Sequence, residues 1–327
     1  MGRVLILNDE AVEQVLTLPG VLTAVSEAFE ALSARKARLL PTVRERVSDS
    51  SYFGLRSAIE PSRQLLGLKA SVFAPANVTR GLESHQASIL LLRPEDGRVV
   101  AIVAGNSVTR MRTAASSVVA TRLLARSDGR RVLIVGTGAQ AEAHVVALDW
   151  ALSDRLPMFW AHAPRGNQGR QKTEVLVQRL AKKGVRIQSA FDLPRAAMEA
   201  DIIVTATASR RAILAASWLR PGTHVNAVGS DAPGKRELDD DLIMRARIFV
   251  DDAGQAAAFG ECQWLAGTGS DEVTAIGDVL RGVRVGRTSE QEVTVFDSTG
   301  LAMHDVATAE LARVKAIEAG IGEWVDM

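Results

Sequence analysis

The chain has 327 residues, which is more than a single hydrophobic core usually supports, so we expect two domains. Hydrophobic residues make up 47% of the chain and charged residues 24%, a composition that excludes an intrinsically disordered protein. The 39 Lys and Arg residues nearly balance the 38 Asp and Glu residues, and a net charge of +1 argues against nucleic-acid binding, which is typical of strongly basic chains.

The N-terminal part of the chain combines one long predicted helix with several strands. Apolar residues recur at a helical period over residues 12–38, with Pro19 near an expected boundary, and Pro41 ends the helical run. Short apolar or alternating segments predict strands over residues 42–47, 51–55, 65–73, 87–92 and 99–103. Because short turns join these strands, we expect an antiparallel or mixed sheet.

A different pattern begins with an Ala- and Ser-rich helix predicted over residues 108–125. Later strands are predicted over residues 131–135, 158–161, 185–189, 201–207, 223–228, 248–251 and 293–296. Helices are predicted over residues 139–152, 171–183, 193–200 and 301–320. Strands that alternate with helices indicate βαβ units and a parallel sheet.

The cysteine content and the N-terminus predict a cytoplasmic protein. A single cysteine, Cys262, can form neither an intrachain disulfide nor a multi-cysteine metal site, which fits a reducing compartment. Asp9 and Glu10 follow too soon after the N-terminus for a secretory signal, and no apolar run approaches the ~18 residues of a membrane span. We therefore expect no membrane contact.

The motif Gly136-x-Gly138-x-x-Ala141 stands between a predicted strand and a predicted helix. Gly136 permits a tight turn, Gly138 allows the backbone to approach a pyrophosphate, and Ala141 allows close packing of helix on sheet. The N–H groups at the start of the helix suit an anion. The motif predicts dinucleotide binding, and the alternative is a glycine-rich turn that only packs.

The end of the second strand of this unit bears on the choice of cofactor. NAD sites usually have an acidic residue there to bind the ribose hydroxyl, but this strand is followed by His162, Arg165 and Arg170. Cations at this position, in the absence of an acid, favour NADP(H) over NAD(H), because they can bind the 2′-phosphate of NADP(H). The alternative is that these are solvated loop charges and that either cofactor is used.

Cations near the apolar N-terminal strands are candidates for binding an anionic substrate. Lys69 lies within an apolar strand, and Arg112 precedes Thr113 at an expected helix start, where a cation and a helix N-terminus together suit an anion. Arg44 is the third of these cations. Each of them could instead be an ordinary surface or ion-paired residue.

Two further residues have both a chemical and a structural interpretation. Asp231 follows an apolar strand of the predicted parallel sheet and is a candidate catalytic acid or base. Alternatively, its side chain forms an Asx-turn before Pro233. His85 could donate to a ligand or be a satisfied loop residue. No His, Cys and carboxylate cluster has metal-ligand spacing, and no Gly-x-Ser-x-Gly motif supports a hydrolase.

Taken together, these motifs resemble the ornithine cyclodeaminase/mu-crystallin family. The matching stretches are residues 67–69, 84–86, 112–116, 136–140, 226–229, 231–238 and 295–298. The resemblance implies a homodimer with an α/β fold, in which a Rossmann NAD(P)-binding domain is inserted in a mixed α+β domain for substrate binding and dimerisation. The implied boundaries are 1–119 with 299–327 for the substrate domain and 120–298 for the Rossmann domain.

The resemblance also implies roles for individual residues. Arg44, Lys69 and Arg112 correspond to the cations that bind the substrate carboxylate, and Asp231, with Lys69, to the catalytic residues. The positions implied to contact the cofactor are Ser84, His85, Arg112, Thr113, Gly136, Thr137, Gly138, Ala139, Gln140, His162, Arg165, Thr205, Val228 and Ser298. The glutamate that positions ornithine in cyclodeaminases has no counterpart near residues 52–58, where Arg56 stands.

The expected activity is NAD(P)H-dependent reduction of small cyclic ketimine carboxylates. Δ1-pyrroline-2-carboxylate and Δ1-piperideine-2-carboxylate would give L-proline and L-pipecolate. Asp231 would stabilise the iminium charge while water or the substrate supplies the proton. The alternatives are an ornithine cyclodeaminase, which releases ammonia and recycles NAD, and a crystallin-like NADPH-dependent binding protein.

Overall fold

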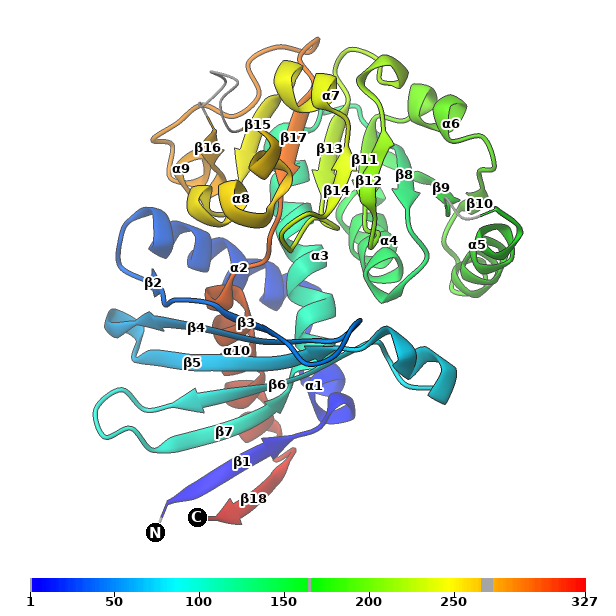
Figure 1. Cartoon of the computed structure of the whole chain (residues 1–327). Helices are drawn as coiled ribbons and strands as arrows, with labels where there is room; N and C mark the ends of the chain where they lie inside the picture. Colours follow the sequence, from blue (N-terminus) through cyan, green and yellow to red (C-terminus); the bar gives the residue numbers. More distant parts are fainter. Residues whose placement is uncertain (1, 164–165, 266–272) are drawn as a thin grey trace. The chain divides into compact units, whose positions relative to one another are not determined.

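A computed structural model describes residues 2–163, 166–265 and 273–327. The chain divides into two compact units (Figure 1). The terminal unit consists of residues 1–112 and 301–327, and the central unit consists of residues 113–300. Both ends of the chain thus belong to one unit, and the other unit is a continuous insertion.

The terminal unit is built on a mixed sheet with strand order β18-β1-β7-β6-β5-β4-β2, and β3 pairs with β4. The strands are β1 Arg3–Leu7, β2 Arg38–Leu39, β3 Val43–Arg46, β4 Tyr52–Glu60, β5 Leu65–Phe73, β6 His85–Leu92, β7 Val99–Ala104 and β18 Glu323–Asp326. β1 is parallel to β7 and the other pairings given are antiparallel, which confirms the expected antiparallel or mixed sheet. The two termini lie side by side (Figure 1) because β18 pairs with β1.

The helices of this unit are α1 Asp9–Val15, α2 Leu18–Ser33 and α10 Ala302–Ala319. The single helix expected over residues 12–38 is wrong, because Thr17 separates α1 from α2 and caps α2 by accepting a hydrogen bond from the Gly20 N–H. Pro19 lies in the first turn of α2, where a missing N–H is tolerated. α2 ends at Ser33, well before Pro41, and Arg35 then adopts a positive φ of 56°.

α10 packs closely against the sheet. A Cβ atom at Gly67 in β5 would lie 3.0 Å from Val306 Cγ2 of α10 and 2.8 Å from the Leu90 carbonyl oxygen. A glycine is therefore needed at this point of the strand.

Among the described residues, no single helix is long and apolar enough to cross a membrane. α1 and α2 reach that length and composition only together, as a pair bent by 92°.

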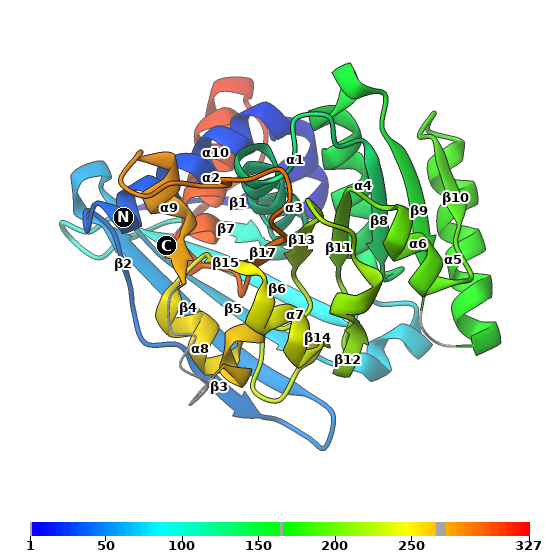
Figure 2. The ribbon, with the colours of Figure 1, turned by 90° about the horizontal axis from the view of Figure 1, so that it is seen from above.

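The central unit is built on a parallel sheet with strand order β10-β9-β8-β11-β13-β17-β15-β16. The strands are β8 Arg131–Val135, β9 Met158–His162, β10 Ile187–Ser189, β11 Ile202–Thr205, β13 His224–Ala227, β15 Arg247–Val250, β16 Thr274–Ala275 and β17 Thr294–Asp297. Figure 2 shows β10 to β15 side by side in this order across the view. The pairings given are parallel, as the alternating pattern predicts.

Helices flank this sheet, and shorter elements follow the later strands. The α-helices are α3 Gly105–Leu124, α4 Ala139–Ala151, α5 Gly166–Ala181, α6 Leu193–Glu199, α7 Asp240–Arg245, α8 Ala253–Phe259 and α9 Ile276–Leu280. A small separate pair of strands consists of β12 Arg210–Leu214 and β14 Arg236–Leu238. α3 begins in the terminal unit and continues into the central one. α7, α8 and the β12–β14 pair are too short to be predicted from periodicity.

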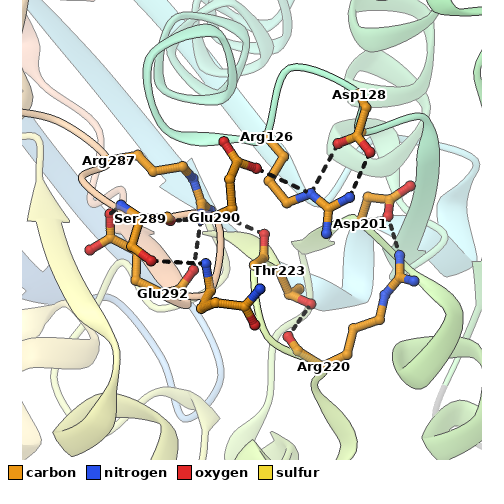
Figure 3. A network of polar contacts seen from close by, with 12 residues as sticks. Arg126, Asp128, Asp201, Arg220, Thr223, Arg287, Ser289, Glu290 and Glu292 are labelled. Atoms are coloured by element: carbon orange, nitrogen blue, oxygen red, sulfur yellow. Dashed lines mark hydrogen bonds and ion pairs between the residues drawn. The ribbon is translucent and has the colours of Figure 1, made fainter.

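A polar network lies where the strands of the central sheet begin (Figure 3). Asp201, directly before β11, accepts a hydrogen bond of 2.9 Å from the Arg131 N–H and pairs with Arg220. Arg287 donates to the Glu292 carbonyl oxygen at 2.7 Å. Because parallel sheets bind their ligands at the opposite edge, where strands end, we interpret this network as structural.

Candidate functional site

Cationic side chains share one face of the sheet in the terminal unit. Arg44 in β3 lies opposite Gly54 in β4, and Arg56, two residues further along β4, lies opposite Lys69 in β5. Residues opposite one another in adjacent strands project from the same face, and so do residues two positions apart in one strand. These three cations therefore project from one face, on which Gly67 leaves room for α10.

Lys69 and Arg112 meet at a buried carboxylate. Lys69 Nζ lies 2.7 Å from Asp305 Oδ2, and Arg112 Nε lies 2.8 Å from Asp305 Oδ1. Lys69 Nζ also donates a 3.3 Å hydrogen bond to Thr109 Oγ1. None of the three charged side chains is more than 6% exposed. The structure thus brings together two of the three cations that were predicted to bind a carboxylate, and it adds Asp305.

The surroundings of this cluster differ from the expectation in two respects. Arg112 lies in the middle of α3, so the predicted helix start at this position, and with it the support from a helix N-terminus, is wrong. Asp305 was missed because it lies far along the chain, in α10. In the sequence Asp305 stands between His304 and Val306, in a stretch of helix whose residues are all buried, and this burial is the only signal that marks it.

Burial and ion pairing set the protonation of the cluster. Burial lowers the pKa of Lys69 to about 8, although the charge of Asp305 acts to raise it. Burial by itself would raise the pKa of Asp305, but the charges of Arg112 and Lys69 outweigh it and lower that pKa to about 2. At pH 7 the cluster therefore holds two cations and one carboxylate, and its excess positive charge suits a carboxylate ligand.

The other predicted residues of this unit lie nearer the surface. Arg44 is exposed, and its guanidinium carbon lies 5.2 Å from the centre of the Tyr52 ring, so it shares the face of Lys69 but not the buried cluster. Ser84 and His85 are half-buried at the start of β6. The Ser84 carbonyl oxygen accepts a hydrogen bond of 2.7 Å from the Ala74 N–H.

Thr205, Val228 and Ser298, which are among the residues predicted to contact the cofactor, lie at the ends of neighbouring strands of the central sheet. The register places one row of residues level across five strands: His162, Val135, Thr205, Ala227 and Asp297. Gly136, Val228 and Ser298 directly follow three of these residues. The structure thus gathers these predicted positions at the carboxyl edge of the sheet, where parallel sheets bind ligands.

The turn after β8 is tight at its first glycine and open at its second. Gly136 adopts a φ of +135°, and a Cβ atom there would lie 2.5 Å from the Ala206 carbonyl oxygen. A Cβ atom at Gly138 would meet nothing within 4 Å, so the backbone is open on this side. Gly138 caps α4, which begins at Ala139 as predicted, and Ala141 is fully buried. Thr137 lies in this turn and Gln140 in the first turn of α4, where backbone N–H groups suit an anion.

We expect substitution by alanine to have different effects at the two glycines of the turn. We expect Gly136→Ala to destabilise the cofactor-free protein, because the new methyl group would collide with the Ala206 carbonyl. Gly138→Ala is expected to leave thermal stability unchanged and to weaken cofactor binding at least roughly tenfold, because its methyl group would occupy the open side of the turn. Thermal melting and cofactor titration measure the two effects, and normal cofactor affinity in Gly138→Ala would contradict the assigned site.

The end of β9 presents a histidine. His162 Nδ1 donates to the Ala190 carbonyl oxygen at 2.8 Å, which fixes the orientation of the ring. Arg170 in α5 lies with its guanidinium carbon 5.0 Å from the centre of the Phe191 ring. Arg165, the third cation predicted to bear on cofactor choice, lies outside the described residues.

A buried histidine that was not predicted contacts the first turn of α4 and α3. His144 in α4 donates from Nδ1 to the Gln140 carbonyl oxygen at 2.7 Å, and its Nε2 accepts from Ser117 Oγ of α3 at 2.9 Å. Burial lowers the pKa of His144 to about 4, so the ring is neutral at pH 7 and its two nitrogens have fixed roles. The predicted cofactor residue Thr113 is also buried on α3, one turn before Ser117.

Asp231 lies on the loop between β13 and β14. Lys235 Nζ lies 2.6 Å from Asp231 Oδ1 and donates to the Gly229 carbonyl oxygen at 3.1 Å. Glu237 holds the base of the loop, because its carboxylate accepts hydrogen bonds from the N–H groups of Gly229 at 2.8 Å and Thr207 at 2.7 Å. The Asp231 side chain is 47% exposed, so it is oriented by an ion pair and open to solvent.

Buried acids behind this loop were also missed. Glu261 accepts a hydrogen bond of 2.7 Å from the Glu237 N–H, and Asp297 accepts one of 2.9 Å from the Cys262 N–H. Burial, with the charge of Asp297 added, raises the pKa of Glu261 to about 9, and burial raises that of Asp297 to about 7. Both acids accept hydrogen bonds from backbone N–H groups. In the described part of the chain, no group of three or more His, Cys, Asp and Glu is arranged to hold a metal ion.

Comparison with known proteins agrees with this arrangement. The model of the Ornithine cyclodeaminase/mu-crystallin family matches residues 3–320, which confirms the resemblance seen in the motifs. Iminosuccinate reductase from Paracoccus denitrificans (strain Pd 1222) is 32% identical over 327 residues, covering 99% of this chain and 100% of the relative. Delta(1)-pyrroline-2-carboxylate reductase from the same organism is 36% identical over 258 residues, covering 76% of this chain and 79% of the relative.

Solved structures share the fold over the whole chain. An archaeal alanine dehydrogenase dimer with bound NAD superposes with a TM-score of 0.91 at 31% identity, covering 100% of both chains. Delta(1)-pyrroline-2-carboxylate reductase from Thermococcus litoralis, in complex with NADH and L-proline, superposes with a TM-score of 0.89 at 28% identity, covering 98% of this chain and 99% of that chain. These likenesses confirm the predicted α/β fold class with its Rossmann-like parallel sheet.

Proposed function

This chain belongs to the ornithine cyclodeaminase/mu-crystallin family, and we propose that it reduces the C=N bond of a small α-imino carboxylate with a nicotinamide cofactor. An oxidoreductase acting on CH–NH bonds, as the sequence predicts, is confirmed by the reductases and dehydrogenases among its relatives. The cyclic ketimines Δ1-pyrroline-2-carboxylate and Δ1-piperideine-2-carboxylate, with L-proline and L-pipecolate as products, are the first members of this class to test.

The buried cluster of Lys69, Arg112 and Asp305 carries this proposal. Its two cations are held in fixed positions by one carboxylate, and the cluster keeps an excess positive charge. An α-imino carboxylate has its carboxylate one bond away from the imine carbon. A clamp on that carboxylate therefore also fixes the position of the carbon that is reduced, which is catalysis by orientation.

The remaining chemistry is divided between the cofactor and Asp231. Gly136, Gly138 and the start of α4 would hold the diphosphate of the cofactor, and the reduced cofactor would supply a hydride. The imine carbon accepts this hydride, the C=N electron pair moves to nitrogen, and one proton completes the amine. The protonated iminium is the better acceptor, so we assign to Asp231 the stabilisation of its positive charge, with water or the substrate supplying the proton.

The same proposal extends to domains, assembly and location. Residues 1–119 and 299–327 would bind substrate and form a homodimer, and residues 120–298 would bind the cofactor. The compact units of the structure change at residues 112 and 300. The dimeric state of the archaeal neighbour supports the homodimer. A cytoplasmic location completes the proposal.

We retain NADP(H) as the favoured cofactor within this proposal. β9 ends with His162 and no acidic residue, which removes the usual partner of the NAD ribose hydroxyl. The solved neighbours hold NAD or NADH, so both cofactors belong in the test. The ratio of kcat/KM with NADPH and NADH decides between them.

A panel of substrates tests the proposed reaction. Oxidation of NADH or NADPH is followed with five- and six-membered cyclic ketimines, with pyruvate plus ammonia and with pyruvate plus methylamine. Stoichiometric cofactor oxidation supports a reductase. Ammonia release from L-ornithine with catalytic NAD would instead identify a cyclodeaminase, and cofactor binding without turnover of any compound would identify a binding protein.

The lowered pKa of Lys69 predicts how substrate binding depends on pH. Lys69 is protonated below about pH 8 and loses its charge above it, so KM for the imino acid is expected to rise as the pH increases through 8. Lys69→Arg should keep its charge and remove this increase. The profile is measured with the cofactor at saturation, and a KM that rises equally in both proteins would contradict the role of Lys69.

A further inference from the structure

The loop between β13 and β14 is bordered by a short 3-10 helix, η5 Glu261–Trp264, which follows α8. Gln263 in η5 is half-buried, and its side-chain amide faces this loop. Gln263 Oε1 accepts a hydrogen bond of 2.8 Å from the Gly234 N–H, and Nε2 donates to the Lys235 carbonyl oxygen at 3.2 Å. The same Nε2 donates to the Gly260 carbonyl oxygen at 2.8 Å. One amide group thus joins two consecutive residues of the loop to the start of η5.

Lys235 connects these contacts to Asp231. The Lys235 carbonyl oxygen also accepts a hydrogen bond of 3.2 Å from Trp264 Nε1, so two side chains of η5 hold the same backbone oxygen. The Lys235 side chain in turn lies 2.6 Å from Asp231 Oδ1. Because a side chain starts from its own backbone, a shift of the Lys235 backbone would displace the ammonium group that orients Asp231.

η5 is itself fixed to the interior of the central unit. The buried Asp297 accepts a hydrogen bond of 2.9 Å from the Cys262 N–H, and Glu261 accepts one of 2.7 Å from the Glu237 N–H at β14. A Cβ atom at Gly260 would lie 2.4 Å from Asp297 Oδ2, so the chain packs directly against this carboxylate at the start of η5. Anchored in this way, η5 can support the loop from a fixed position.

Within the reaction proposed above, on which this inference rests, we infer that Gln263 is a positioning residue, which holds the loop so that Asp231 lies where it stabilises the iminium. The ion pair of Asp231 with Lys235 is partly exposed and therefore weak by itself, so the position of Asp231 depends on the backbone that carries it. Electrostatic stabilisation requires a charge that is in place before the reaction begins. Loosening the loop should therefore lower kcat rather than the affinity for substrate or cofactor.

Gln263→Met tests this inference, because it nearly keeps the length of the side chain and removes its hydrogen bonds. We expect kcat to fall about tenfold, with KM for the imine and the affinity for the cofactor each within about twofold of the wild-type values. Gln178→Met is the matched control. Gln178 is exposed on α5, so this variant should keep the kcat of the wild type.

A second variant shows whether Gln263 acts through Asp231. When Gln263→Met is added to Asp231→Asn, kcat should fall by less than about twofold, because the charge that Gln263 positions is already absent. An equal fold-loss in the wild-type and Asp231→Asn backgrounds would overturn the inference. A normal kcat of Gln263→Met, beside a slowed Asp231→Asn, would overturn it as well, and both results would leave the proposed reaction standing.

Amide hydrogen exchange tests the support of the loop without any turnover. Exchange over residues 229–238 of the full chain, followed by mass spectrometry, should be at least about fivefold faster in Gln263→Met than in the wild type, and exchange in β8 should be unchanged. Unchanged exchange over residues 229–238 would overturn the inference. Faster exchange there in a chain that reduces no imine would support the positioning of the loop by Gln263 and contradict only the reaction.

Discussion

Asp231→Asn is expected to lower kcat by about 10²- to 10³-fold while cofactor affinity stays within about twofold of the wild-type value. The amide has nearly the shape of the carboxylate and can still accept a hydrogen bond from Lys235, so the loop should keep its conformation. What the variant loses is the negative charge that would stabilise the iminium. Steady-state kinetics with the accepted imine, together with titration of the cofactor, give both quantities.

A nearby aspartate on the same unit is the control for this loss of charge. Asp240 is 69% exposed at the start of α7 and pairs with Arg236, so Asp240→Asn removes one negative charge without touching the loop. Its kcat should remain that of the wild type. A kcat of Asp231→Asn that is also near normal would remove Asp231 from the mechanism, and equal losses in both variants would point to a general effect of charge.

Features that depend on a short stretch of chain were predictable from the sequence. The turn at Gly136 and Gly138 is one of these, because strand, turn and helix are consecutive and the steric requirement for glycine is local. β5, β8 and the start of α4 were placed correctly for the same reason. The break at Thr17 was predicted only as a boundary near Pro19, because the apolar period continues through it and hides the end of α1.

Partners that are distant in sequence could not be predicted in the same way. Lys69 and Arg112 were identified as candidates, but their common partner Asp305 lies 193 positions after Arg112, and no local pattern relates these residues. Glu237 was recognised as part of a motif, but the hydrogen bond that its carboxylate accepts from the Gly229 N–H could not be predicted, because it depends on the fold. Short end strands such as β1 and β18 pair only because the sheet of the terminal unit brings the chain ends together.

Asp305→Asn is expected to reduce the free energy of unfolding by about 3–5 kcal/mol, because it leaves the buried charges of Lys69 and Arg112 without their counter-ion. The contribution of Asp305 should be complete at neutral pH. Its pKa of about 2 in the folded protein lies below the ordinary value of 3.8, so this stabilisation is lost only as the pH falls toward 2. Urea unfolding of the cofactor-free variant at pH 7 measures the loss.

Two further variants decide whether the loss in Asp305→Asn arises from unpaired buried charge. Asp96→Asn makes the same change at an exposed acid that lies 2.8 Å from Arg98, and its effect should be much smaller because solvent screens that pair. Lys69→Met combined with Asp305→Asn removes one buried cation together with the acid, so the double variant should lose less stability than the two single losses added together. Strict additivity would contradict a coupled cluster, and would mean that Asp305 stabilises α10 independently of the cations that we propose to bind the substrate.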